Sequence, residues 1–158
     1  MANDPFFEEG SRLLTPPAFD VVLTSELKRA VRSQCFLTLV VLEARREWDG
    51  LEMTADEGTV KEVAQVIGRE VRETDPIGKT ERGSLALVLL DADFDSSTRV
   101  IDRLVSRIDN YDFPTPLRIS VGAACYPTHA VDAESLKRLA ISRPVVSWRG
   151  GPSTPNNP

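Results

Sequence analysis

Residues 60–90, VKEVAQVIGREVRETDPIGKTERGSLALVLL, are the most informative stretch of this chain for its fold, because the spacing of their apolar side chains changes along them. The first third is apolar at every third or fourth position, which predicts a helix over about 56–71. Pro76 ends this helix, since the residue before a proline avoids the helical region. A short strand at 77–80, a polar turn and a fully apolar strand at 85–90 then predict a hairpin.

The segments on both sides of this stretch continue the alternation. Helical spacing predicts helices, and short runs of branched apolar residues predict buried strands. The further elements expected are a helix at 16–31, a strand at 36–42, a helix at 100–108, a strand at 117–125 and a helix at 133–140. The order contains βαββαβ, so the predicted fold class is α+β: a ferredoxin-like or palm-type antiparallel sheet backed by helices on one face.

The domain boundaries follow from composition. A chain of 158 residues fits one domain. Residues 1–10 are acidic without apolar spacing, and residues 144–158 hold four of the eleven prolines. We therefore expect a disordered tail at 1–10, a domain at 11–143, and a disordered Pro/Gly/Asn-rich tail at 144–158. The charged run at 43–49 is expected to be a solvated loop.

Composition excludes several function classes. The net charge of -5 argues against binding to nucleic acid, which needs clustered Lys and Arg. No apolar run approaches the roughly 20 residues of a membrane span, and the acidic start is unlike a signal peptide, so we expect a cytoplasmic protein without a membrane partner. Two cysteines and one histidine, His129, provide neither a zinc spacing nor a Cys-His or Ser-His-Asp set. No cofactor or metal is expected.

Three segments of the chain resemble the GGDEF domain, the fold of diguanylate cyclases. Leu14-Thr15 with Phe19 resembles the opening motif L-T-G-x-x-N-R-x-x-F, shortened here in its middle. Residues 71–75, VRETD, resemble the v-R-x-x-D run that precedes the family's signature, and residues 119–127 resemble the strand S-x-G-x-A-x-y-P. The likeness covers roughly residues 12–141 and implies the palm-type fold.

In this register the GGDEF signature falls on Glu81-Arg82-Gly83-Ser84-Leu85, where Gly83 and Ser84 replace the acidic pair. In the family, carboxylates from this turn and from the first strand hold two Mg²⁺ ions that activate the substrate. Glu43 is the candidate acid on the first strand, and one carboxylate is too few for a hard divalent ion. Glu57 is the candidate for the guanine-reading acid. The resemblance therefore implies lost cyclase activity, no catalytic residue and no metal.

The resemblance also implies a retained ligand site. In the family, R-x-x-D forms an inhibitory site for cyclic di-GMP, and Arg72 and Asp75 stand at those positions. A guanidinium group pairs with guanine O6 and N7, and a carboxylate accepts from guanine N1 and N2. The ligand is an anion, and the third helix offers Arg99, Arg103 and Arg107, of which Arg103 is included in the predicted site.

Three functions remain open at this point, the third of them an enzyme that uses GTP with unusual residues, which the lost carboxylates disfavour. The first is a catalytically inactive GGDEF-like domain that binds cyclic di-GMP and passes occupancy to a protein partner or to its own dimer. The alternative is a ligand-free interaction or dimerisation module with the same fold. The residues alone also fit a plain surface ion pair between Arg72 and Asp75 and a solvated arginine row. An Arg72 side chain that reaches solvent beside Arg103 would favour the receptor, and a buried ion pair would favour the module.

Overall fold

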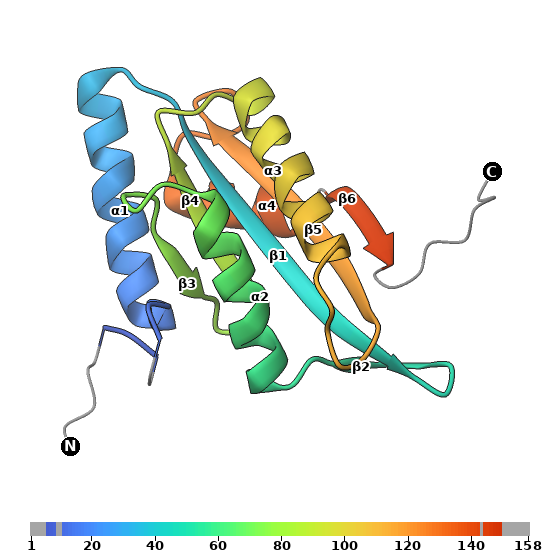
Figure 1. Ribbon diagram of the computed structural model, residues 1–158. Helices are drawn as coiled ribbons and strands as arrows, with labels where there is room; N and C mark the ends of the chain where they lie inside the picture. The colour runs from blue at the N-terminus through green and yellow to red at the C-terminus, as the bar shows by residue number, and fades with distance from the viewer. Residues whose placement is uncertain (1–5, 9–10, 143, 150–158) are drawn as a thin grey trace.

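The computed structural model describes residues 6–8, 11–142 and 144–149. Its six-stranded sheet has the order β3-β4-β1-β5-β6, with β2 paired to β1, and all strand pairs are antiparallel (Figure 1). The elements are α1 (Pro16–Ser33), β1 (Leu37–Trp48), β2 (Leu51–Thr54), α2 (Glu57–Glu70), β3 (Ile77–Lys79), β4 (Leu85–Leu90), α3 (Phe94–Asp109), β5 (Leu117–Tyr126), α4 (Ala133–Ser142) and β6 (Pro144–Arg149). The predicted α+β class and the βαββαβ order are confirmed.

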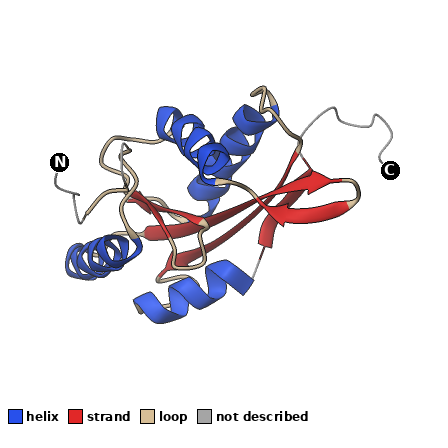
Figure 2. Ribbon diagram, turned by 90° about the horizontal axis from the view of Figure 1, so that it is seen from below, coloured by secondary structure: helices blue, strands red, loops and turns tan. Residues whose placement is uncertain are grey.

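Helices cover both faces of the sheet. Val40 and Leu42 of β1 pack in one apolar cluster with α2 and α3, whereas Leu39 and Val41 pack in a second cluster with α1 and α4. Figure 2 shows helices above and below the strands. The prediction of helices on one face was therefore wrong, because a strand that is apolar at every position needs cover on both faces.

Aspartate side chains cap the N-termini of three of the four helices. Asp56 Oδ1 accepts from the Thr59 N–H at 2.7 Å, Asp93 Oδ1 from the Ser96 N–H at 2.8 Å, and Asp132 Oδ1 from the Ser135 N–H at 2.8 Å. Each carboxylate satisfies a backbone donor that the helix leaves without a partner. These caps place α2, α3 and α4 at defined points after the preceding strands or loops.

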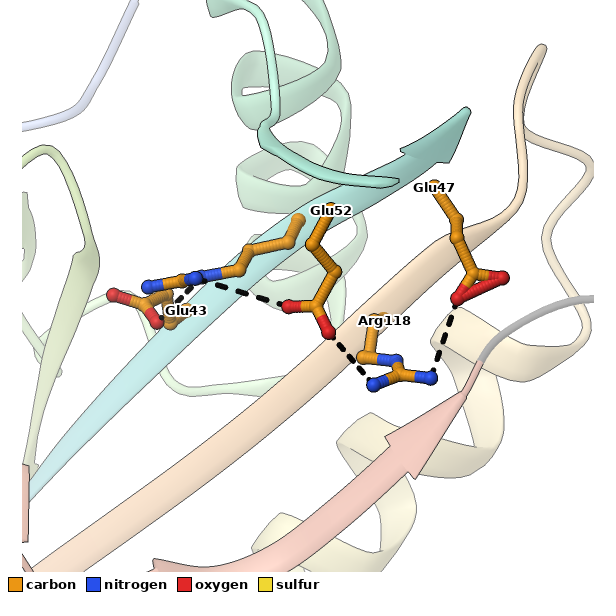
Figure 3. A network of polar contacts seen from close by, with 5 residues as sticks. Glu43, Glu47, Glu52 and Arg118 are labelled. Atoms are coloured by element: carbon orange, nitrogen blue, oxygen red, sulfur yellow. Dashed lines mark hydrogen bonds and ion pairs between the residues drawn. The ribbon is translucent and has the colours of Figure 1, made fainter. Parts of the chain in front are cut away.

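The charged run at 43–49 was predicted as a solvated loop, and this prediction was wrong: residues 43–48 are the second half of β1, and Asp49 begins the turn after it. Asp49 and Gly50 have positive φ angles of 52° and 80° and turn the chain into β2. Charged side chains on one face of this extension meet across strands: Arg118 Nη1 lies 2.7 Å from Glu52, and its Nη2 lies 3.2 Å from Glu47 (Figure 3). Cross-strand pairing of opposite charges supports a strand that local composition does not favour.

Both ends of the domain extend beyond the predicted boundaries. Residues 144–149, expected in a tail, form β6, which pairs with β5. A proline at its first position suits an edge strand, where one backbone donor fewer is tolerated. Phe7 forms a β-bridge with Leu14, so residues 6–8 are also tied to the domain. The remaining tail residues, 1–5, 9–10 and 150–158, lie outside the described residues. Within the part of the chain that is described, no helix is both long enough and apolar enough to cross a membrane.

Candidate functional site

Residues 80–84 form the turn between β3 and β4, where the resemblance places the GGDEF signature. The Thr80 N–H donates to the Ser84 carbonyl at 2.9 Å, and the Ser84 N–H donates to Thr80 Oγ1 at 3.1 Å. Gly83 has a φ of 85°, a conformation that favours glycine. Glu81 and Arg82 are exposed, and Ser84 is buried. The turn is closed by its own hydrogen bonds, and Ser84 is 8% exposed.

A cleft of about 180 Å³ adjoins this turn on the α4 side of the sheet. Its polar lining comes from three segments: β1, the turn and β5. The lining residues that carry charged or hydroxyl groups are Glu43, Arg45, Thr80, Arg82, Ser84 and Ser120. The one carboxylate among them, that of Glu43, lies 3.0 Å from the Nε of Arg45. The cleft therefore combines a single, already paired carboxylate with two guanidinium groups.

The acids predicted from the family do not come together at this cleft. Glu57 is exposed in the first turn of α2, which packs on the other face of the sheet from α4. Among the described residues, no group of three or more His, Cys, Asp and Glu side chains is placed to hold a metal ion. A pair of Mg²⁺ ions needs several oxygen ligands from more than one element. The residues that line the cleft do not fit such a pair.

The Arg72–Asp75 segment joins α2 to β3, at the other end of the β3–β4 hairpin from the signature turn. Asp75 is buried, with 8% of its surface exposed. Its Oδ2 accepts from the Arg72 N–H at 3.2 Å, and its Oδ1 accepts from the Leu90 N–H at 3.1 Å. The Asp75 N–H in turn donates to the Arg72 carbonyl at 3.0 Å. The Asp75 carboxylate thus ties the loop to the end of β4.

The Arg72 side chain has the opposite character. It is exposed, and no hydrogen bond or ion pair joins its guanidinium group to another described residue. The two residues do not form the plain surface ion pair considered above, because Asp75 is directed inward and accepts from the backbone N–H of Arg72 rather than from its side chain. The loop therefore presents the guanidinium group of Arg72 to solvent.

Arg103 lies on α3 and reaches the end of α2. Its Nη2 donates to the Glu70 carbonyl at 3.0 Å, and its Nε lies 3.4 Å from Glu70 Oε1. Arg107, one turn further along α3, lies 3.2 Å from the other carboxylate oxygen, Oε2. Glu70 is the last residue of α2, two positions before Arg72. Arg72 and Arg103 are therefore brought to the same end of α2.

Sequence reasoning named Arg72, Asp75 and Arg103 but missed two features of this site. The inward direction of Asp75 depends on the N–H of Leu90, fifteen positions along the chain. The role of Glu70 depends on α3, with Arg103 thirty-three positions away. A Glu in the last turn of a helix, where the helix dipole disfavours a negative charge, is the one signal that could have pointed to Glu70.

Comparisons with known proteins support the fold. The sequence matches no protein-family model and no curated protein. The structure is similar to the GGDEF domain of DgcB from Caulobacter crescentus in complex with c-di-GMP, with a TM-score of 0.69 and 16% identity over 90% of each chain. It is also similar to the GGDEF domain of TpbB, or YfiN, from Pseudomonas aeruginosa, with a TM-score of 0.68 and 20% identity over 85% of this chain and 84% of that one.

A third similar structure is the active GGEEF domain of a diguanylate cyclase from Vibrio cholerae, with a TM-score of 0.68 and 11% identity over 83% of this chain and 87% of that one. The resemblance drawn from the sequence and the similarity in structure thus agree, although they rest on different observations. Short motifs carry the first, and the arrangement of the backbone carries the second. The chain has the fold of the GGDEF domain, the palm-type fold of the diguanylate cyclases.

Proposed function

We propose that this protein is a catalytically inactive GGDEF-type signalling domain that binds cyclic di-GMP through Arg72, with Arg103 as a second cation. The observation that carries the proposal is the exposed Arg72 guanidinium group, which no described residue engages. A planar guanidinium group can pair bidentately with guanine or lie against the base. One similar structure, that of DgcB, is a complex with c-di-GMP.

Asp75 receives a different role from the one expected. Both of its carboxylate oxygens accept from backbone N–H groups, and it is buried. We propose that it holds the loop so that Arg72 points outward, which makes it a positioning residue rather than a reader of the base. Preorganising a loop lowers the entropic cost of ordering a long side chain when a ligand binds.

The signature turn supports the absence of cyclase activity. Phosphoryl transfer to a hydroxyl group depends on metal ions that neutralise the triphosphate and activate the nucleophile. Gly83 and Ser84 carry no charge, and Glu43 is paired with Arg45 at 3.0 Å. We expect no turnover when the pure protein is incubated with GTP and Mg²⁺. Formation of cyclic di-GMP above the rate without protein would refute this part of the proposal.

Calorimetric titration with cyclic di-GMP tests the receptor. We expect binding to the intact chain and a loss of roughly 10- to 100-fold in affinity in Arg72→Ala, the range for one charged hydrogen-bonding group. Arg32→Ala is the matched control, because Arg32 is also an exposed arginine near the C-terminal end of a helix but lies on α1, on the opposite face of the sheet. Equal affinities in both variants, or no binding to the intact chain, would refute the proposal.

The alternative is a ligand-free interaction or dimerisation module. The burial of Asp75 favours it, since a carboxylate turned inward is not presented to guanine. Sedimentation velocity of the intact chain, with and without cyclic di-GMP, separates the two. A dimer whose dissociation constant is the same with and without the nucleotide would favour the module. A nucleotide-dependent change in mass would favour the receptor, because ligand binding and assembly would then be coupled.

A further inference from the structure

A carboxylate lies between two arginine side chains where α2 and α3 meet. Glu70 Oε1 is 3.4 Å from Arg103 Nε, and Glu70 Oε2 is 3.2 Å from Arg107 Nε. The Glu70 side chain is 17% exposed, whereas those of Arg103 and Arg107 are 50% and 61% exposed. The anion is therefore covered, and the two cations around it are open to solvent.

The arrangement has the form of an occupied oxyanion site. Arg103 and Arg107 are four residues apart on α3, so their side chains lie on one face of the helix. Each guanidinium group engages a different oxygen of the same carboxylate. Guanidinium groups bind carboxylates and phosphates with the same geometry, and a phosphate group could take the place of the Glu70 carboxylate.

Glu70 also has a route out of this site. It is the last residue of α2, and Val71 after it is already extended, with φ -109° and ψ 166°. Among the described residues, its carboxylate is paired with the two arginines and with no other side chain. The Arg103 Nη2 bond goes to the Glu70 carbonyl, so this bond persists when the side chain rotates away. The side chain can therefore swing into water without unfolding the helix end.

We propose that Arg103 and Arg107 form a phosphate-binding pair that Glu70 keeps closed, so that an anionic ligand binds only by displacing the Glu70 carboxylate. A phosphate and a carboxylate cannot share the pair, because like charges at such distances repel strongly. The proposal rests on the proposed function in one respect: since Arg72 follows Glu70 by two positions, the phosphate would belong to cyclic di-GMP. The closure of the pair by Glu70 does not depend on the identity of the ligand.

Inorganic pyrophosphate is the probe for the pair itself. We would titrate it calorimetrically, at low ionic strength, into the intact chain, Glu70→Gln and Glu73→Gln. Glu73 is exposed and forms no ion pair with a described residue, so its variant makes the same change in net charge without opening the pair. We expect affinity to rise roughly tenfold or more in Glu70→Gln and less than about twofold in Glu73→Gln. Adding Arg107→Ala to Glu70→Gln should remove the gain.

Three results would overturn the proposal: equal affinities in Glu70→Gln and Glu73→Gln, a gain that survives Arg107→Ala, and no pyrophosphate binding to any variant. Far-ultraviolet circular dichroism of each variant shows that the fold is retained. A parallel titration with cyclic di-GMP distinguishes the two proposals. If Glu70→Gln gains affinity for pyrophosphate but no protein binds cyclic di-GMP, the proposed function is refuted and the closed pair is supported. If the intact chain, Glu70→Gln and Glu73→Gln bind cyclic di-GMP equally and Glu70→Gln gains no affinity for pyrophosphate, the proposed function is supported and the closed pair is refuted.

Discussion

Replacement of Asp75 should destabilise the fold, although the residue stands at a predicted ligand-binding position. Its carboxylate is buried and accepts from the N–H groups of Arg72 and Leu90. Asp75→Ala leaves both donors without a partner in a region that water does not reach freely. Asp75→Asn keeps one acceptor oxygen but turns an amide donor toward the second N–H group.

The two distances set the size of the effect. Bonds of 3.1 and 3.2 Å lie at the long end of the usual N–H···O range, so each should contribute near the lower limit of about 1.5 kcal/mol for a bond to a charged group. We therefore expect Asp75→Ala to lower the free energy of unfolding by about 3 kcal/mol, and Asp75→Asn by about 1.5 kcal/mol. For a domain of this size, 3 kcal/mol corresponds to a fall in Tm of about 6–12 °C.

Urea denaturation at pH 7, followed by circular dichroism, measures these differences. Arg72→Ala is the control, because its exposed side chain should change the free energy of unfolding by no more than about 0.5 kcal/mol. We therefore expect different effects from the two positions: substitution of Arg72 should lower ligand affinity, and substitution of Asp75 should lower stability. If Asp75→Asn is as stable as the intact chain, the carboxylate does not hold the loop, and the positioning role proposed for Asp75 is refuted.

Further predictions concern the helix caps, two glycines and the charged strand extension. The backbone N–H bond to each cap lowers the pKa of Asp56, Asp93 and Asp132, so their contribution to stability is complete above the ordinary value of 3.8 and is lost as the pH falls from there through the lowered pKa of the folded state. Replacing any one of them by Ala should lower the free energy of unfolding at pH 7, and a urea titration that finds the same loss at pH 2 would contradict this assignment. Gly78→Ala should cost about 2–3 kcal/mol, because its Cβ would lie 2.7 Å from Cδ1 of the buried Phe19 ring. Gly83→Ala meets no atom within 4 Å and should cost about 1 kcal/mol through its φ of 85° alone, so equal costs in the same assay would argue against the Phe19 contact. Arg118→Ala should cost about 1 kcal/mol at low salt and much less in 1 M NaCl, because its ion pairs with Glu47 and Glu52 are partly exposed; a cost that is insensitive to salt would be the contrary result.

The order of the elements could be predicted from the sequence because it depends on local patterns. The helical stripe that contains Val60, Val63 and Ile67 is the buried face of α2, and the apolar run at 85–90 is β4. Such a pattern shows which face of an element is buried, and it does so whichever element packs against that face. The position of the signature turn and of the Arg72–Asp75 loop follows from the same patterns, since each lies between two such elements.

The strands that sequence analysis missed depend on partners distant in the chain. The second half of β1 is highly charged, and it is a strand because Arg45 and Arg46 pair with Arg118 and Leu117 of β5. Likewise, residues 144–149 are a strand because β5 offers them a free edge. Local composition favours a loop in the second half of β1, and only the pairing overrides it. In residues 144–149 the two valines and the tryptophan suit a strand, but the prolines, glycines and asparagines of 144–158 predicted a tail.

Local sequence sets which side chains stand at the candidate site, because the order of residues along the chain places Arg72 and Asp75 after a helix and before a hairpin. The directions of these side chains come from the packing of the folded chain. The carboxylate of Asp75 faces inward because the N–H of Leu90 requires an acceptor there, and the carboxylate of Glu70 lies between Arg103 and Arg107 because α2 packs against α3. A buried donor must find its acceptor from whichever segment the fold brings near, and a single stretch of sequence does not contain that information.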